Sequence, residues 1–109
     1  TEWEYGEYEG ITTAQIHRSA PDWAIWTHGG PGGESPEQVA ARVDTFIARV
    51  RAEASRRALV FAHGHILRVL AARWLEQPPA EGAHYRLDTG RLSILGWERQ
   101  TPAIQMWNA

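Results

Sequence analysis

Hydrophobic positions recur at helical spacing in the first half of the chain. Residues 12–15, Thr-Thr-Ala-Gln, carry the capping-box pattern, which predicts a helix over residues 13–19. From Val39 to Val50, apolar residues recur three and four positions apart, with arginines between them. This spacing predicts a long amphipathic helix over residues 36–56, with a proline at its first position, where a missing N–H costs nothing.

The pattern changes at residues 58–62, where Ala-Leu-Val-Phe-Ala is apolar without alternation. A run of this kind is typical of a strand that is covered on both faces. His63-Gly64-His65 follows directly, and residues 66–75 have the broad apolar face of a helix. The pattern therefore predicts a helix–strand–turn–helix unit, with a histidine cluster at the carboxyl end of a buried strand.

The end of the chain alternates between apolar and polar residues and is rich in β-formers. We predict three strands there, at residues 84–87, 92–97 and 104–107, with turns near Thr89-Gly90 and Thr101-Pro102. Together with the preceding helices, these strands indicate an α/β fold.

Composition narrows the possible chemistry. The 109 residues fit one domain, and the formal net charge of −2 gives no reason to expect binding to nucleic acid or to an anionic membrane. No apolar run reaches the roughly 18 residues that a membrane span needs. Cysteine and lysine are both absent, which excludes thiolate metal sites, cysteine nucleophiles and lysine Schiff bases. We therefore expect neither a nucleic-acid nor a membrane partner. The absence of cysteine leaves the redox compartment open, and a cytoplasmic location is our expectation.

His63-Gly64-His65 stands where a predicted strand meets the start of a predicted helix. In open α/β sheets, ligands bind outside the carboxyl ends of the strands, and a helix N-terminus offers unpaired N–H groups to an anion. Gly64 lets the backbone approach a ligand, and the two histidines add donors that titrate near neutral pH. A histidine held in the core and a zinc site are the other interpretations. The candidates for a third zinc ligand are Glu2, His28 and Glu34.

The first ten residues contain four glutamates interleaved with aromatic residues, and no basic residue. Aromatic neighbours can desolvate a carboxyl group until it is able to serve as a general acid. A solvated acidic loop is the other interpretation. Composition alone does not decide which of the four would have the catalytic role. They are Glu2, Glu4, Glu7 and Glu9.

Three motifs occur in a fixed order along the chain. They are Glu-Trp-Glu-Tyr-Gly-Glu-Tyr-Glu-Gly at residues 2–10, Gly-Gly-Glu-Ser at residues 32–35, and Val-Phe-Ala-His-Gly-His-Ile-Leu-Arg at residues 60–68. In this order they resemble the histidine phosphatase superfamily, also called the phosphoglycerate-mutase-like family. The first and last motifs are most similar to its sedoheptulose-bisphosphatase and acid-phosphatase-like members. The resemblance covers nearly the whole chain.

The resemblance implies a role for each matching residue. Glu2 corresponds to the general acid, and His63 to the second catalytic histidine, which helps to hold the transferring phosphoryl group. Gly64 can offer its N–H to the same phosphate. Three further residues are expected to line the substrate pocket: Trp26, His28 and His65. Glu34 and Arg68 match positions that mostly support the site. No metal and no organic cofactor is implied.

The family's nucleophile has no counterpart in these residues. It is the histidine of an Arg-His-Gly motif on an N-terminal strand, and this motif does not occur in the sequence. The resemblance therefore implies that residues 1–109 are the C-terminal portion of a single histidine phosphatase domain. We expect a three-layer α/β/α phosphoglycerate-mutase-like fold that lacks the N-terminal strand with the nucleophile. The run at residues 58–62 is expected to need that N-terminal part as a partner, and a homodimer is left open.

The implied activity is hydrolysis of phosphomonoesters, either sugar phosphates or other small phosphomonoesters, through a phosphohistidine intermediate. This chain would supply the general acid and the second histidine, and we expect it to be inactive by itself. Two alternatives stay open. One is a phosphoglycerate-mutase-type enzyme, which returns the phosphoryl group to a second hydroxyl of its substrate. The other is a noncatalytic module that binds phosphorylated ligands or a protein.

Overall fold

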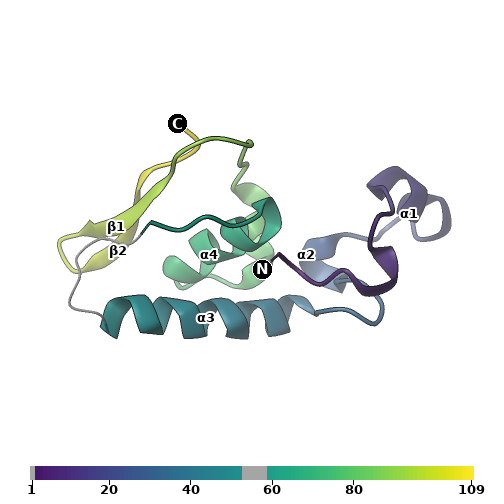
Figure 1. The fold of residues 1–109 in the computed structure, drawn as a ribbon, viewed down its shortest axis with the longest axis horizontal. Helices are drawn as coiled ribbons and strands as arrows, with labels where there is room; N and C mark the ends of the chain where they lie inside the picture. Colours follow the sequence, from purple (N-terminus) through teal and green to yellow (C-terminus); the bar gives the residue numbers. More distant parts are fainter. Residues whose placement is uncertain (1, 53–58) are drawn as a thin grey trace.

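The computed structural model describes residues 2–52 and 59–109 (Figure 1). Its helices are α1 (Thr13–Ser19), α2 (Ile25–His28), α3 (Pro36–Ala52) and α4 (Gly64–Trp74), with short 3₁₀ helices η1 (Gly6–Tyr8) and η2 (Pro79–His84). Its strands are β1 (Ile94–Glu98) and β2 (Thr101–Met106). The described residues thus combine helices with a small antiparallel sheet, in agreement with the α/β class. Within these ranges, no helix has both the length and the apolar character needed to cross a membrane.

A reciprocal capping box starts α1. The Gln15 N–H donates to Thr12 Oγ1 at 3.2 Å, and the Thr12 N–H donates to Gln15 Oε1 at 3.0 Å. Each side chain therefore satisfies a backbone donor that the helix leaves unpaired. The predicted helix over residues 13–19 is confirmed.

The same device starts α3. Ser35 and Gln38 exchange hydrogen bonds at 3.1 and 2.8 Å, and the helix begins at Pro36 as predicted. The structure describes α3 up to Ala52, so the predicted extension over residues 53–56 lies outside the described residues. α4 packs against α3 and starts at Gly64, two residues before the predicted start.

The apolar run before α4 does not form a strand. Residues 59–62 have no strand partner in the described structure, and the side chains of Leu59 and Phe61 are 73% and 87% exposed. The predicted strand with two covered faces is therefore not formed among the described residues, and Ala58 lies outside them. A strand needs a neighbour to pair its backbone groups. The two described strands pair with each other instead.

β1 and β2 form an antiparallel hairpin. Trp97 pairs with Pro102 and Glu98 with Thr101, and Arg99 adopts the left-handed conformation at a φ of 56°. The turn predicted near Thr101-Pro102 is present but shifted to residues 99–100, so that Thr101 and Pro102 belong to β2. Pro102 can belong to β2 because every strand of a two-stranded sheet is an edge strand, where a missing N–H is tolerated.

The strand predicted at residues 84–87 is also wrong. η2 extends to His84, and Tyr85 folds back onto the segment before it. The Tyr85 N–H donates to the backbone oxygen of Gly82 at 3.1 Å, and its hydroxyl donates to Gln77 Oε1 at 2.5 Å. These local hydrogen bonds favour a turn over the strand that the alternating pattern predicts. Alternation over only four residues is weak evidence for a strand.

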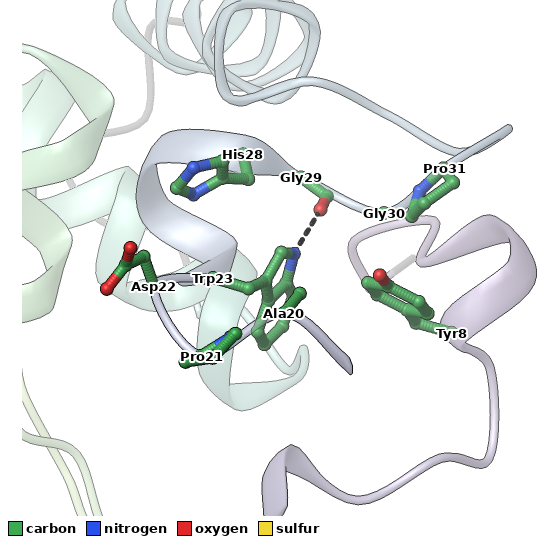
Figure 2. Close-up of a pocket in the computed structure, with 9 residues that line it drawn as sticks. All are labelled: Tyr8, Ala20, Pro21, Asp22, Trp23, His28, Gly29, Gly30 and Pro31. Atoms are coloured by element: carbon green, nitrogen blue, oxygen red, sulfur yellow. Dashed lines mark hydrogen bonds between the residues drawn. The ribbon is translucent and has the colours of Figure 1, made fainter. Parts of the chain in front are cut away.

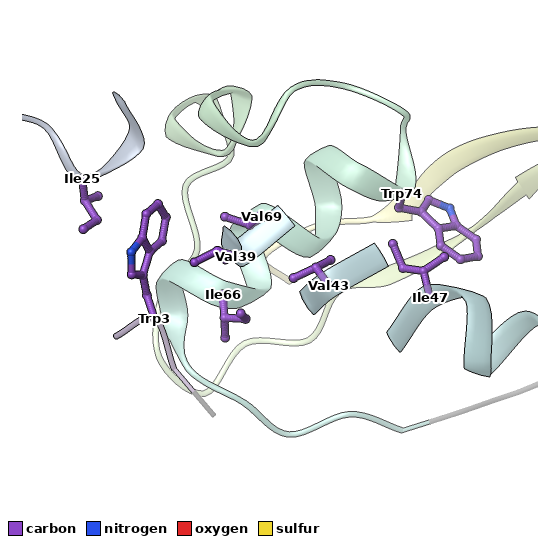
Figure 3. Packing of buried hydrophobic residues seen from close by; sticks show 8 residues of the cluster. All are labelled: Trp3, Ile25, Val39, Val43, Ile47, Ile66, Val69 and Trp74. Carbon is purple, nitrogen blue, oxygen red and sulfur yellow. The ribbon is translucent and has the colours of Figure 1, made fainter. Parts of the chain in front are cut away.

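The hydrophobic core lies between α3 and α4 (Figure 3). Its buried side chains are Trp3, Ile25, Val39, Val43, Ile47, Ile66, Val69 and Trp74. Figure 3 shows Trp3 near one end of this cluster and Trp74 at the other. Trp3 is 2% exposed, although it comes from the very start of the chain. The core therefore fixes the N-terminal segment, and with it Glu2, against the start of α4.

Candidate active site

Glu34 holds the N-terminal segment in place. Its backbone oxygen accepts the Trp3 Nε1–H at 2.9 Å, and its N–H donates to the backbone oxygen of Glu4 at 2.8 Å. Its carboxylate accepts the Glu4 N–H at 2.9 Å and two bonds from Arg42 at 2.8 and 3.1 Å. Arg42 also donates to the backbone oxygen of Glu2 at 3.1 Å. These bonds fix the backbone from which the Glu2 side chain extends.

The glycine-rich loop before Glu34 allows this close packing. A Cβ on Gly30 would lie 1.7 Å from the backbone oxygen of Tyr5, and a Cβ on Gly33 would lie 2.2 Å from that of Glu4. Any other residue would force the two segments apart, so both positions require glycine. The loop thus brings the acidic N-terminal segment against the start of α3.

The Glu2 carboxylate lies on the N-terminus of α4. Its Oε1 accepts the N–H groups of Ile66 at 2.8 Å and of Trp3 at 2.7 Å, and its Oε2 accepts the N–H of His65 at 3.1 Å. The first amides of a helix have no partner within it, and the helix dipole favours a negative group at this end. The structure therefore brings the predicted general acid to the His63-Gly64-His65 motif from more than sixty residues away.

His63 and Gly64 open the helix. His63 is the N-cap residue, its side chain is exposed, and its backbone oxygen accepts the Leu67 N–H at 3.1 Å. A Cβ on Gly64 would meet nothing within 4 Å, so the space beside its backbone is open. No described residue accepts the Gly64 N–H. This donor and the exposed imidazole are therefore available to a ligand.

His65 is half-buried in a cluster of aromatic and charged groups. Its Nδ1 lies 2.5 Å from the Tyr5 hydroxyl oxygen, and its ring packs edge-on against Trp26 at a centroid distance of 5.3 Å. Burial lowers the pKa of His65, the charge of Arg68 lowers it further, and the charge of Glu2 opposes both. Burial, followed by the charges of Glu2 and Glu9 and a side-chain hydrogen bond to Glu2, raises the pKa of Tyr5 to about 12. At neutral pH the imidazole is therefore uncharged and the phenol keeps its proton.

Arg68 contacts the Trp26 ring of this cluster and the backbone of η2. Its guanidinium lies 4.6 Å from the centre of the Trp26 ring, in cation–π geometry. Its Nε donates to the backbone oxygen of Gly82 at 3.1 Å, and its Nη2 donates to that of Ala83 at 3.1 Å. These bonds hold the guanidinium in place over the Trp26 ring, which in turn packs against His65.

His28 lies elsewhere, in an open hollow of about 440 Å³ (Figure 2). Figure 2 shows it at one side of Trp23, whose Nε1–H donates to the backbone oxygen of Gly29 at 2.8 Å. His28 Nδ1 bonds with Ala24 and Thr27, on its own helix or next to it. Trp26 and His65 therefore lie together near Glu2, whereas His28 belongs to another surface of α2, and its contact with substrate stays a prediction.

The proposed zinc ligands do not converge. Across residues 2–52 and 59–109, no group of three or more His, Asp or Glu side chains is placed to hold a metal ion. Glu2 directs both carboxylate oxygens at backbone amides instead.

Sequence reasoning missed the contact between Tyr5 and His65. In the sequence, Tyr5 is only one of the aromatic residues among the glutamates. It lies 60 residues before His65, with which it forms this contact. The only hint in the sequence is that Tyr5 lies three positions after Glu2. The segment that carries the predicted acid therefore also carries the phenol.

A profile described as Histidine phosphatase superfamily (branch 1) matches residues 1–109. The chain belongs to the histidine phosphatase superfamily. This histidine phosphatase chain is 46% identical over 98 residues to an acid phosphatase of Mycobacterium tuberculosis, covering 89% of this chain and 48% of that protein. It is 39% identical over 90 residues to sedoheptulose 1,7-bisphosphatase of Saccharomyces cerevisiae, covering 67% of this chain and 33% of that protein. The family predicted from the motifs is thus confirmed.

A solved structure with the same fold over these residues is that of an open-reading-frame product of Mycobacterium tuberculosis. It matches this histidine phosphatase chain with a TM-score of 0.93 at 42% identity, covering 98% of this chain and 56% of that one. This chain spans less than half the length of the two curated relatives it matches.

Proposed function

We propose that residues 1–109 are the C-terminal portion of a histidine phosphatase that hydrolyses small phosphomonoesters, sugar phosphates among them, through a phosphohistidine. The observation that carries this proposal is the Glu2 carboxylate, which is seated on the N-terminus of α4 beside His63 and Gly64. An acid next to free N–H donors suits a reaction in which a phosphoryl group leaves an alcohol oxygen. The phosphatase names of the two relatives support the same class.

The reaction has two steps. A histidine supplied from outside this chain attacks phosphorus in line, the bond from phosphorus to the ester oxygen breaks, and Glu2 gives its proton to that oxygen. Water then attacks the phosphohistidine while Glu2 takes a proton from it, which releases inorganic phosphate and restores both groups. His63 and the Gly64 N–H stabilise the negative oxygens of the moving phosphoryl group.

The hydrogen bonds support Oε2 as the oxygen of Glu2 that carries the proton. A carboxylate oxygen has two lone pairs. Both lone pairs of Oε1 are used by the N–H groups of Trp3 and Ile66, whereas Oε2 accepts one described bond, from His65. Oε2 therefore keeps a lone pair for the transferred proton.

The rest of the domain is proposed to cover the exposed apolar run. Val60 and Phe61 line a shallow groove of about 290 Å³ together with apolar residues of α3 and α4 such as Phe46 and Leu70. A strand from the N-terminal part would pair with residues 59–62 and complete a central sheet. The greater length of the relatives supports this arrangement. Because the nucleophile lies outside residues 1–109, we expect no turnover from this chain alone.

The deciding experiment is a product assay on the complete protein. Purified enzyme is incubated with an aryl phosphate and with a sugar phosphate, and inorganic phosphate, isomerised sugar phosphate and acid-labile phosphoenzyme are measured. Release of inorganic phosphate with a trapped phosphohistidine is the expected result. Isomerised product would identify a mutase, and phosphate binding without turnover would identify a noncatalytic module.

A further inference from the structure

The Tyr5 hydroxyl and the His65 ring form a polar contact that the proposed reaction does not use. The distance between Tyr5 Oη and His65 Nδ1 is 2.5 Å, and the two rings meet edge-on at a centroid distance of 5.7 Å. The charged groups around the pair are Glu2 on the N-terminal segment and Arg68 on α4, with Glu9 near the phenol. The pair thus lies next to the proposed acid.

The direction of this bond follows from the acceptors at hand. A neutral imidazole has one N–H donor and one bare nitrogen acceptor. If Nδ1 carried the proton, the Tyr5 O–H would need another acceptor. Glu2 is the other candidate, because its charge and a side-chain hydrogen bond to it help to raise the pKa of the phenol, but the 2.5 Å contact with Nδ1 is the one contact of the hydroxyl that has full hydrogen-bond geometry among the described residues. With Nδ1 as its acceptor, the hydroxyl is the donor of this bond, and the proton of the neutral ring is then on Nε2.

The second ring nitrogen is open to a ligand. Nε2 has no hydrogen-bond partner among the described residues, and none of their buried side-chain nitrogens lacks one, so solvent reaches Nε2. A half-buried N–H donor without a protein acceptor favours an acceptor from the ligand. The oxygens of a dianionic phosphoryl group are acceptors only and match it.

We propose that Tyr5 is a positioning residue whose hydroxyl fixes His65 as the neutral Nε2–H tautomer, so that Nε2–H donates to a phosphoryl oxygen of the substrate. This inference deepens the proposed function and rests on it. His65 then offers the same single donor at every pH above its lowered pKa, and Tyr5 keeps the ring from turning its bare nitrogen toward the phosphate.

The first test observes the ring directly. The complete protein is labelled with ¹⁵N-histidine, and the signals of His65 are assigned with the His65→Gln variant. We expect a protonated Nε2 and a hydrogen-bonded, unprotonated Nδ1, and we expect added inorganic phosphate to shift Nε2. In Tyr5→Phe, the Nδ1 signal should move to that of an unbonded nitrogen, and the pKa of His65 should rise toward its ordinary value of about 6.5.

Tyr85→Phe is the matched control. Its hydroxyl also makes a 2.5 Å bond, to Gln77, and its ring also packs edge-on against an aromatic neighbour, Trp107. The variant therefore loses an equivalent hydrogen bond that does not involve His65. We expect no change in the His65 signals.

The second test uses the pH profile of the aryl phosphatase reaction. Tyr5→Phe should lower kcat/KM by about three- to tenfold, the effect of one lost hydrogen bond. It should also move the acid limb to higher pH, because a raised pKa removes the neutral imidazole at higher pH. Tyr85→Phe should change neither.

Three results would overturn the inference. One is a proton on Nδ1 of the wild-type ring, which needs no variant to observe. Another is a Tyr5→Phe protein whose His65 signals and pKa are those of the wild type. The third is an altered ring with an unchanged pH profile. Failure of the proposed function is distinguishable, because it abolishes turnover without affecting the tautomer seen by ¹⁵N NMR.

Discussion

The two ends of α4 are fastened by different kinds of interaction. At the start, a carboxylate from a distant segment binds the first amides, and a phenol binds His65. At the end, Trp74 is buried in the core, its Nε1–H donates to the backbone oxygen of Gly96 at 2.9 Å, and Arg73 pairs with Asp44. Polar groups can change partners when a ligand arrives, whereas packed apolar groups cannot. We therefore expect changes at the start to affect activity and changes at the end to affect stability.

The largest expected effect is on the rate. Glu2→Gln removes the acid and should lower kcat of the complete enzyme by about 10²–10⁴-fold, with a stability loss of about 1 kcal/mol from the weakened helix cap. Steady-state assays and a denaturation curve measure the two. Glu4→Gln is the control, because the exposed Glu4 carboxylate makes no bond in the described structure. Activity that survives Glu2→Gln but is lost in His63→Ala would show that the roles are assigned wrongly.

The second effect is on stability. Trp74→Ala leaves a cavity at the end of the core and should lower the free energy of unfolding by about 3–5 kcal/mol. Denaturant titration measures this loss, and kcat per folded enzyme should hardly change. Trp97→Ala is the control, because Trp97 packs against Trp74 but is 46% exposed. An equal loss in both variants would show that Trp74 does not anchor this end of the helix.

A smaller loss is expected from the ion pair. The Arg73 guanidinium binds Asp44 through two bonds at 2.8 and 2.9 Å, but both side chains are partly exposed. Asp44→Asn should therefore cost about 0.5–1 kcal/mol of unfolding free energy and leave kcat unchanged. Arg86→Gln, which removes a longer contact of 3.4 Å at a well-exposed side chain, should have no measurable effect. A fall in kcat for Asp44→Asn would contradict the expectation that changes at the end of α4 affect only stability.

The smallest expected effect is a pH dependence of stability at the start of α4. Because burial lowers the pKa of His65, the unfolded chain binds a proton there at a higher pH than the folded chain. The contribution of His65 to the free energy of unfolding is fully present above about pH 6.5, and it decreases as the pH falls toward the pKa of the folded state. Denaturation midpoints measured across this range should lose that slope in His65→Gln. They should keep it in His84→Gln, because His84 is exposed on η2. If the pH dependence of the denaturation midpoint is unchanged in His65→Gln, another group causes it.

The sequence was sufficient for elements whose cause is local. The capping boxes at Thr12 and Ser35 involve residues three positions apart, so they can be read directly from the sequence and they start α1 and α3 as predicted. The apolar spacing of α3 likewise reports which face is buried. In contrast, the apolar run at residues 59–62 predicts burial but does not show which segment covers it. In the described structure, Leu59 and Phe61 of this run are exposed.

The site depended on information of a different kind. The resemblance supplied Glu2 and His63, and the fold brings Glu2 to the motif that contains His63. The Tyr5–His65 bond could not be predicted, because it joins residues 60 positions apart and depends on how closely two loops approach. That approach is set by Gly30 and Gly33, whose role as contact points is invisible without the neighbouring segment.

The exposed run at residues 59–61 also bears on how the protein is made. Ribosomes extend a chain from its N-terminus at about 5–20 residues per second, and folding begins during synthesis. In the proposed arrangement the covering strand precedes residue 1, so it has left the ribosome before Leu59 and Phe61 emerge, and they find a partner at once. A circularly permuted gene that places residues 1–109 first would reverse this order. The nascent chain would then display an unpaired apolar segment until the end of translation, which favours aggregation.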